Sequence, residues 1–435
     1  MTGYLDSAIK FVYLCGGEFL NYFDKREELY GSIRGVFAWD WMYDNEYALA
    51  SIHYITEEFR SEIAYATEEL GKLYAKTVNT LQQGPDELLS MLGLPHQALG
   101  AVRVPVFSDI VTIIGRFDFA QTNEGLKMLE FNADTPTSVV EAFYVNAKAS
   151  EYLCAANPNV GVENDLAHAF RHVAEKYKEM GFETNEVVFS SLSWHEEDRG
   201  TTDYLLRQSG LEGKFVPLED LRVYEDRLCY NDGKNYQPIN VWYRLHALEK
   251  LAEEKDEDGY PTGEHVLDLI ARRRLAIINP PSAFIAQTKG VQCLIWGLYE
   301  EGQFYTEHER EIIKKYMLPT YFENKFIGNS SYVTKPIYGR EGGAISLFNQ
   351  DGVIIDQDKE EFYWEQPMVY QKMVELEEIQ TDTISGPYKG RALWGSFLAG
   401  GKASACSLRI GDLITGNLSC FLPVGYKKLN IERGT

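Results

Sequence analysis

Residues 114–132 carry the pattern that most constrains the fold, because charged and aromatic residues alternate on both sides of a turn. Arg116 and Asp118 stand two positions apart before the turn-rich stretch 121–125, and Glu130 and Asn132 stand two positions apart after it. Alternate residues of a β-strand share one face. We therefore expect a hairpin in which these four side chains converge on the same face.

The chemistry of that face suits a phosphate-handling site. Carboxylate and amide oxygens are hard ligands that Mg²⁺ accepts, so Asp118, Glu130 and Asn132 are candidate metal ligands. Arg116 beside them can hold an anionic group with two hydrogen bonds. Metal, carboxylates and arginine together are the groups that handle a triphosphate. The alternative is a cross-strand salt-bridge cluster on an exposed hairpin.

A second candidate segment is V-T-K-P-I-Y-G-R-E-G-G at 333–343, where a predicted strand carrying Lys335 enters a glycine-rich turn with Arg340. Glycines let backbone N–H groups approach phosphate oxygens, and a lysine neutralises their charge. Gly339, Gly342 and Gly343 are the candidate positions. The segment matches neither the P-loop pattern nor the dinucleotide fingerprint. Taken alone, such a loop is more often a hairpin turn than a phosphate-binding loop.

Composition excludes some classes of function. The chain has 435 residues, 45% hydrophobic and 13% aromatic, so we expect a folded protein of two or three subdomains. A net charge of −23 argues against nucleic-acid binding and is compatible with a cationic ligand or simply a solvated acidic surface. Six scattered cysteines indicate reduced core residues of a cytoplasmic protein. We see no signal peptide and no membrane-spanning segment, and a homodimer is possible.

The order of the predicted helices and strands indicates a mixed fold of the α+β or α/β class. Helical periodicity covers 44–82, 138–153, 163–181 and a helix starting near Arg199, and the last hundred residues are rich in strands. We expect four segments: a mostly helical part at 1–100 packed on the core, a strand segment with the metal- and acid-binding residues at 101–155, a small α/β subdomain at 155–280, and a clamp with closing strands at 281–435.

Taken together, these motifs resemble the ATP-grasp ligases. The R-x-D…E-x-N pattern resembles their metal-binding strands, and the lysine strand with its glycine loop resembles their nucleotide clamp. Here the metal strands precede the clamp, a permuted order that resembles the glutathionylspermidine synthase family. The same resemblance is carried by N-A-D-T-P-T-S at 132–138, E-D-R-G-T at 197–201 and G-S-F-L-A-G-G-K-A-S-A-C-S-L-R at 395–409. The matches run from about residue 40 to the C-terminus.

The resemblance implies a function and a set of roles. The family joins a peptide-like acid, such as glutathione, to an amine such as spermidine, with ATP and Mg²⁺ as cofactors, through an acyl-phosphate. A catalytic role is implied for Arg116, Arg340 and Arg409, nucleotide binding for Lys289 and Lys335 with the three glycines, and the metal for Asp118, Glu130 and Asn132. The acid would contact Thr135, Thr137 and Glu141, and the amine would lie near Glu197 and Asp198.

Each role has a structural alternative. Lys289 can simply open a helix, and Arg409 can be a surface residue of a strand. Thr135 and Thr137 can be turn residues around Pro136. Glu197 and Asp198 can be acidic caps at a helix N-terminus.

Two departures from the family bear on the substrate. The best-known members carry an N-terminal amidase domain, for which this chain has no room, so we expect no hydrolysis of the product. Thr135, Thr137 and Ser138 stand where the family has serines and a cysteine, which leaves the acid open between glutathione and another small peptide. Two rival functions also stay open: a non-catalytic nucleotide or peptide sensor on this fold, and a hydrolase with Asp118 and Glu130 as an acid–base pair.

Overall fold

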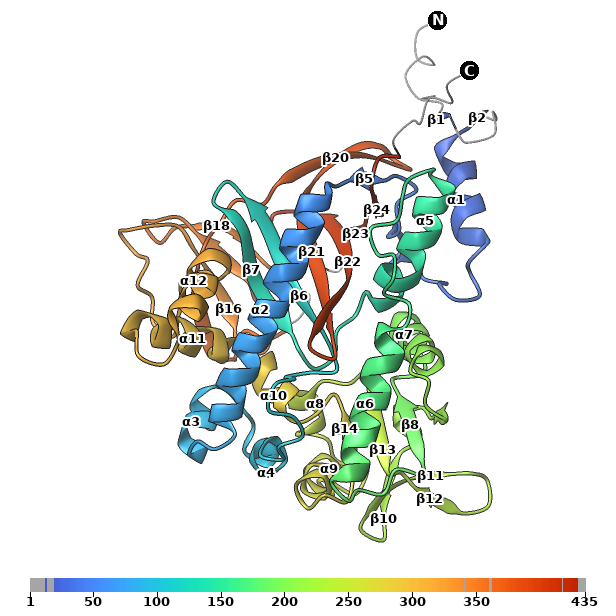
Figure 1. The fold of residues 1–435 in the computed structure, drawn as a ribbon, viewed down its shortest axis with the longest axis vertical. Helices are drawn as coiled ribbons and strands as arrows, with labels where there is room; N and C mark the ends of the chain where they lie inside the picture. Colours follow the sequence, from blue (N-terminus) through green and yellow to red (C-terminus); the bar gives the residue numbers. More distant parts are fainter. Residues whose placement is uncertain (1–11, 14–18, 340–341, 360–361, 417, 429–435) are drawn as a thin grey trace, which may run out of the picture.

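The computed structural model describes residues 12–13, 19–339, 342–359, 362–416 and 418–428. In this part of the chain the largest sheet has six strands and is built around the predicted hairpin (Figure 1). Its path runs β23-β22-β21-β6-β7, and β20 pairs with β21 at one end. The strands are β6 (Ile114–Thr122), β7 (Gly125–Asn132), β20 (Glu378–Thr383), β21 (Gly386–Ala399), β22 (Lys402–Gly411) and β23 (Cys420–Phe421).

A five-stranded antiparallel sheet of described residues forms the clamp beside it, in the order β15-β19-β16-β17-β18. Helix α11 (Lys289–Glu301) packs on this sheet, and α12 (Glu307–Tyr316) contacts both α11 and β7. The strands are β15 (Thr320–Tyr321), β16 (Tyr332–Pro336), β17 (Ser346–Phe348), β18 (Ile354–Gln357) and β19 (Met368–Lys372).

A third sheet, of four parallel strands in the described residues, has the order β14-β13-β8-β9. Helix α7 packs against β8 and β9, and a small antiparallel sheet of β10, β11 and β12 lies beside α9. The elements are α6 (Asp165–Glu179), β8 (Val187–Ser190), α7 (Glu196–Gln208), β9 (Gly213–Phe215), β10 (Arg222–Tyr224), β11 (Arg227–Asn231), β12 (Tyr236–Pro238), β13 (Val241–Arg244), α8 (Leu248–Leu251), α9 (Thr262–Ala271) and β14 (Ala276–Ile278).

Helix α2 (Glu57–Leu81) lies across the six-stranded sheet and contacts β21 and β22 (Figure 1). The expected helix over 44–82 is wrong at its start. Thr56 caps the helix by accepting a hydrogen bond from the N–H of Phe59, and β5 (His53–Tyr54) is a strand paired in parallel with β24 (Val424–Gly425). Because that partner lies far away in the sequence, helical periodicity could not reveal it.

The remaining elements frame these sheets. Short helices or turns are α1 (Tyr22–Gly31), α3 (Asp86–Met91), η1 (His96–Ala98), α4 (Leu99–Val102), the π-helical turn η2 (Glu141–Val145), α5 (Asn146–Tyr152), η3 (Leu218–Asp220) and α10 (Ser282–Gln287). Short strands are β1 (Val12–Tyr13), β2 (Phe19–Leu20), β3 (Trp41–Met42) and β4 (Asn45–Glu46). None of the helices in the described residues is long and apolar enough to cross a membrane.

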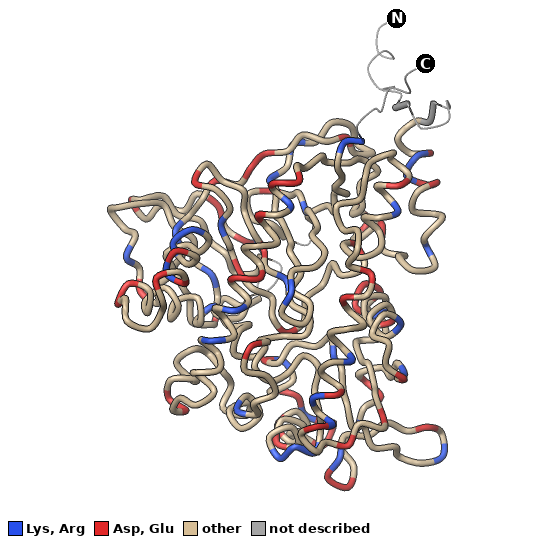
Figure 2. Tube along the Cα trace, in the orientation of Figure 1, with Lys and Arg blue, Asp and Glu red and all other residues tan. Residues whose placement is uncertain are grey.

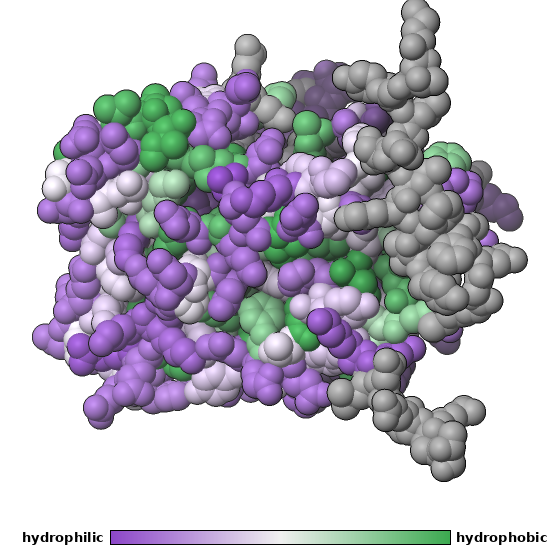
Figure 3. All heavy atoms as spheres, turned by 90° about the horizontal axis from the view of Figure 1, so that it is seen from above, coloured by the Kyte–Doolittle hydropathy of each residue, from purple (hydrophilic) through white to green (hydrophobic). Residues whose placement is uncertain are grey.

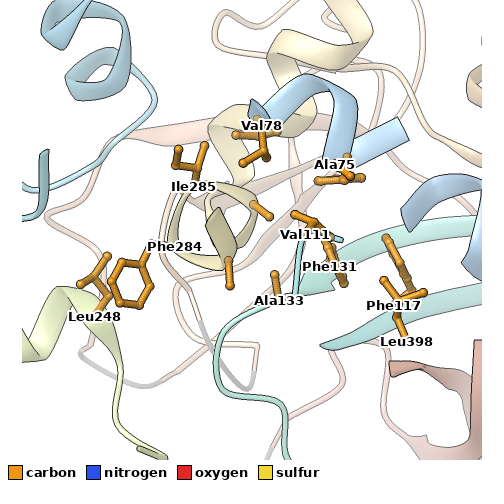
Figure 4. Packing of buried hydrophobic residues seen from close by; sticks show 14 of the residues in the cluster. Ala75, Val78, Val111, Phe117, Phe131, Ala133, Leu248, Phe284, Ile285 and Leu398 are labelled. Atoms are coloured by element: carbon orange, nitrogen blue, oxygen red, sulfur yellow. The ribbon is translucent and has the colours of Figure 1, made fainter. Parts of the chain in front are cut away.

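The alternation of the hairpin divides it between a core and a polar face. The rings of Phe117 and Phe131 stack with centroids 3.8 Å apart, and Tyr74 of α2 packs edge-on against Phe131. Figure 4 shows Phe117 and Phe131 among the buried side chains, with Leu398 of β21 beside Phe117. One hairpin face is therefore fixed in the core, and this fixes the direction of the other face.

Two buried polar contacts join the hairpin to the parallel sheet. The Asn279 side chain, just after β14, accepts hydrogen bonds from the N–H groups of Ile113 and Ile114 and donates to the carbonyl of Asp134. The Arg244 guanidinium at the end of β13 pairs with the Asp134 carboxylate at 2.9 Å, with both side chains buried. These contacts hold the segment that follows β7 at the carboxyl edge of the parallel strands.

The surface matches the composition. Acidic and basic residues are spread over all parts of the fold rather than gathered in one basic stripe (Figure 2). Hydrophilic residues cover most of the face seen from above, with apolar groups in smaller areas (Figure 3). Cys229, Cys293 and Cys406 are buried free thiols and Cys420 is a partly buried one, whereas Cys154 is disulfide-bonded, so the expectation that every cysteine is reduced is wrong there.

Candidate active site

The site lies in a pocket between the six-stranded sheet and the clamp sheet. The pairing of β6 with β7 sets Arg116 opposite Asn132 and Asp118 opposite Glu130, and all four side chains line this pocket. The register shifts between Asp118 and Phe119, where Leu129 is the extra residue of β7 and also lines the pocket. The structure thus brings together the four residues that the alternation selected.

Two arginines meet at Asp118, which is buried. Arg116 donates from Nε to one Asp118 oxygen at 2.6 Å and from Nη2 to the other at 2.9 Å. Arg409, on β22, donates to the same carboxylate at 3.2 Å. Gly395 of β21 makes room for this arrangement, because a Cβ there would lie 2.9 Å from the Arg116 side chain. Arg409 therefore faces the pocket rather than solvent.

Glu130 faces two lysines. Lys289, the first residue of α11, lies 3.3 Å from the Glu130 carboxylate and donates to the carbonyl of Gly339 at 2.9 Å. Lys335 of β16 donates to Gln371 at 2.7 Å and to the carbonyl of Leu129 at 3.2 Å. Burial would raise the pKa of Glu130, but the charges of Lys289, Lys335 and Arg116 outweigh it and lower that pKa to about 2.

Lys335 has an unusual pKa of its own. Burial lowers the pKa of its ammonium group to about 8, although the nearby Glu130 carboxylate opposes the shift. A buried lysine with its charge only partly compensated is poised to receive further negative charge, as a phosphate would bring.

The glycine loop closes one side of the pocket. Gly339, Gly342 and Gly343 all line it, and Arg340 lies outside the described residues. Gly342 has a φ of +77°, and a Cβ there would lie 2.8 Å from the carbonyl oxygen of Thr415. The backbone at this position can therefore be adopted without strain only by glycine.

The expected substrate residues separate into two groups. Thr135, Thr137 and Glu197 line the pocket, and the Thr137 carbonyl accepts a hydrogen bond from Arg116. Glu141 and Asp198 do not line it. Glu141 is fully buried and accepts hydrogen bonds from Trp39 and from Tyr47, each at 2.9 Å, so it supports a pocket-lining tyrosine from behind.

Asp198 belongs to the start of α7. The helix begins at Glu196, three residues earlier than expected, with His195 as the N-cap that accepts a hydrogen bond from the N–H of Asp198. Successive helical residues point about 100° apart, and of these two carboxylates Glu197 lines the pocket whereas Asp198 does not.

Several pocket residues were not identified from the sequence. Gln371 of β19 accepts a hydrogen bond from Lys335, and an apolar wall is formed by residues on and after the clamp strands together with Leu129 of β7 and Leu393 of β21. Tyr47, Met42 and Tyr43 enter from the N-terminal part of the chain. The sequence offered one indication of these residues, which is Gln371 itself. It is a polar residue at a position of β19 where the alternation of the strand predicts a buried side chain. The apolar wall comprises Leu129, Val333, Ile345, Leu347, Met373, Val374, Leu376 and Leu393.

Comparison with known proteins decides the family. The model of the glutathionylspermidine synthase preATP-grasp family matches residues 24–426. The chain belongs to this family. A bifunctional glutathionylspermidine synthetase/amidase of Escherichia coli is 25% identical over 369 residues, which cover 79% of this chain and 56% of that protein. The chain thus spans little more than half the length of that relative.

Two further proteins place the family match in context. A candidate acid–amine ligase of Haemophilus influenzae is 25% identical over 324 residues, covering 72% of this chain and 74% of its own length. The solved structure of a glutathione synthetase-like effector from Globodera pallida matches with a TM-score of 0.55 and 13% identity over 93% of this chain and 96% of that one. The second likeness concerns the fold alone, a mixed α/β architecture.

The donor set in the pocket fits a hard cation. The Asn132 side chain lies 3.3 Å from a Glu130 oxygen and 3.4 Å from an Asp118 oxygen, so two carboxylates and one amide converge. Turning the amide would present three oxygen donors, which suits Mg²⁺. The described residues contain no cluster of three or more His, Cys, Asp or Glu side chains suited to a metal, and the candidate set consists of two carboxylates and one amide.

Proposed function

We propose that this family member is an ATP-dependent carboxylate–amine ligase of permuted ATP-grasp fold. The observation that supports it most is one pocket, between two antiparallel sheets, that holds Arg116, Arg409, Lys289 and Lys335 around Asp118 and Glu130. A nucleoside triphosphate requires cationic side chains around its phosphates, and the metal ion bound to it requires carboxylate ligands. We also propose the segments 1–100, 101–155, 155–280 and 281–435 as the functional parts.

The proposed reaction has two steps. The carboxylate of a peptide-like acid attacks the γ-phosphorus of ATP, forming an acyl-phosphate and releasing ADP. A neutral amine then attacks the acyl carbon, phosphate leaves, and the amine loses a proton to give the amide. Negative charge moves between carboxylate and phosphate in both steps, so fixed cations are the main catalytic requirement.

Different residues of the pocket are assigned to different parts of this reaction. Lys289 and Lys335 bind the phosphates, with the backbone around Gly339 and Gly342 closing over them. Arg116 and Arg409 stabilise the charge of the transferring group. Asp118, Glu130 and Asn132 would hold Mg²⁺, which would supply further neutralisation of phosphate charge. The apolar wall formed by Val333, Leu347, Met373 and their neighbours suits a flat nucleotide base.

The acid and the amine are assigned to the part of the pocket that Thr135, Thr137 and Glu197 line. Thr135 and Thr137 are proposed to bind the acid, which we take to be glutathione or a similar small peptide. Glu197 is proposed to bind the amine, for which a spermidine-like polyamine is the candidate. Glutathionylspermidine synthetase is the activity named for the Escherichia coli relative.

The hydrolase alternative fits the pocket less well. A general acid must carry a proton near neutral pH, but the pKa of Glu130 is lowered to about 2. Asp118 is held by two arginines. A non-catalytic nucleotide or peptide sensor on the same fold stays as the second candidate.

A screen for ADP release tests the proposal. The protein is incubated with ATP, Mg²⁺ and a panel of acids and amines, singly and in pairs, and products are identified by mass spectrometry. We expect ADP and an amide only when an acid and an amine are both present. Nucleotide binding without turnover of any pair would favour the sensor instead.

A further inference from the structure

The turn of the β3–β4 hairpin carries an unusual residue. In W-M-Y-D-N-E, the two residues between the strands are Tyr43 with a φ of 51° and Asp44 with a φ of 60°. Two-residue hairpin turns with positive φ at both positions favour asparagine and glycine. A bulky tyrosine is a conformational outlier there. Such outliers persist only where the surrounding structure holds them.

Buried charged side chains anchor the β3–β4 hairpin. The Arg26 guanidinium, wholly buried, donates to the Asp40 carboxylate at 2.7 Å and to Glu46 at 3.2 Å. It also lies 4.4 Å from the ring centre of Trp41. Glu46 in turn accepts a hydrogen bond from Tyr22 at 2.7 Å. Both strands of the hairpin are thereby anchored, so the position of the turn is fixed.

The anchored turn presents an aromatic ring to the pocket. Met42 and Tyr43 line the same pocket as Glu197 and Tyr47, and Tyr43 is 58% exposed. Exposed large aromatic residues on a rigid support are typical of binding surfaces. Among the described lining residues, Glu197 is the one carboxylate outside the Asp118–Glu130 pair. An aromatic face and a carboxylate are the two groups that receive an ammonium ion.

We propose that Tyr43 determines specificity for the amine, by placing its ring face against an ammonium group of the amine's tail while Glu197 supplies the negative charge. This inference rests on the proposed ligase function. It concerns the residue that recognises the second positive charge on the tail of the polyamine proposed above. Removal of the ring should weaken binding of such an amine by roughly fivefold to thirtyfold.

The experiment compares two amines that differ only in the distal charge. Calorimetry measures the binding of 1,8-diaminooctane and of octylamine to protein saturated with Mg²⁺ and a non-hydrolysable ATP analogue. Variants are Tyr43→Leu, which removes the aromatic face, and Tyr43→Phe, which keeps it. Tyr236→Leu serves as the control, because Tyr236 is 42% exposed on another sheet and does not line the pocket.

The expected result is a preference of the wild type for the diamine that Tyr43→Leu reduces by roughly fivefold to thirtyfold. Tyr43→Phe and Tyr236→Leu should retain the preference, and all variants should bind the nucleotide analogue equally. An unchanged preference in Tyr43→Leu, or an equal loss of both amines, would overturn the inference. If the wild type binds the nucleotide but neither amine, the inference is wrong while the ligase proposal stands. If the wild type fails to bind the nucleotide, the ligase proposal itself is wrong.

Discussion

Nucleotide affinity should fall with rising pH because of Lys335. Its ammonium group is buried, donates to Gln371 and to the carbonyl of Leu129, and has its pKa lowered to about 8. Only the charged form attracts phosphate, and a bound phosphate stabilises the proton. Binding therefore takes up a proton wherever the free protein has lost one, and the affinity declines above pH 8.

The magnitude follows from that pKa. If only the protonated form binds, the apparent Kd rises by a factor of 1 + 10^(pH − 8), which is about 1.1 at pH 7 and about 11 at pH 9. The corresponding proton uptake at pH 8 is about half a proton per nucleotide. For stability the sign is opposite: the penalty of burying the charge is fully present below pH 8 and disappears as pH rises through the unfolded value, about 10.4, so the free energy of unfolding increases over that range.

Calorimetry with ADP at pH 7, 8 and 9, in two buffers of different ionisation enthalpy, measures both quantities. Lys335→Met is the matched control, since it keeps the length of the side chain and lacks the titrating group. Its Kd should be higher than that of the wild type at pH 7 and should change with pH only as the ligand itself titrates. Equal pH dependence in wild type and variant would refute this account of Lys335.

Three further predictions test other parts of the pocket. Arg116→Ala should lower kcat by about two or more orders of magnitude, because a fixed donor to the transferring charge is lost; a change confined to the KM for ATP would contradict this role. Asp118→Ala and Glu130→Ala should each weaken binding of an ATP analogue sharply in calorimetry with Mg²⁺ present, whereas wild-type binding that EDTA leaves unchanged would contradict the metal assignment. Glu197→Gln should raise the KM for the amine with that for ATP nearly unchanged, and Asp198→Asn should instead lower the melting temperature with little effect on either KM.

The convergence at the hairpin could be predicted because it depends on local periodicity. Phe117 and Phe131 fix one face in the core, so Arg116, Asp118 and their partners must share the other. Lys335 could be selected for a similar reason, because its strand ends at Pro336 and Gly339 follows three residues later. The roles of these residues stay predictions, since contact within a pocket does not by itself assign a role.

Other features depend on contacts between distant parts of the chain. Asn279 joins β14 to the start of β6, and Arg244 pairs with Asp134 about a hundred residues away. Tyr43 lines the pocket from a hairpin whose flanking residues Asp40 and Glu46 are held by Arg26, far away in the sequence. The spacing of hydrophobic residues within one segment gives no information on contacts between segments that are far apart in the sequence. The separate placement of Glu197 and Asp198 depended on where α7 begins, and helix boundaries are the least predictable part of an element.

The most direct test of the proposed reaction follows an oxygen atom. The acid that supports ADP release is prepared with ¹⁸O in its reacting carboxylate and incubated with ATP, Mg²⁺ and the amine. The released phosphate is then examined by mass spectrometry. An acyl-phosphate intermediate predicts that each phosphate released with an amide carries one ¹⁸O from the acid. Amide formation with unlabelled phosphate would contradict the proposed mechanism.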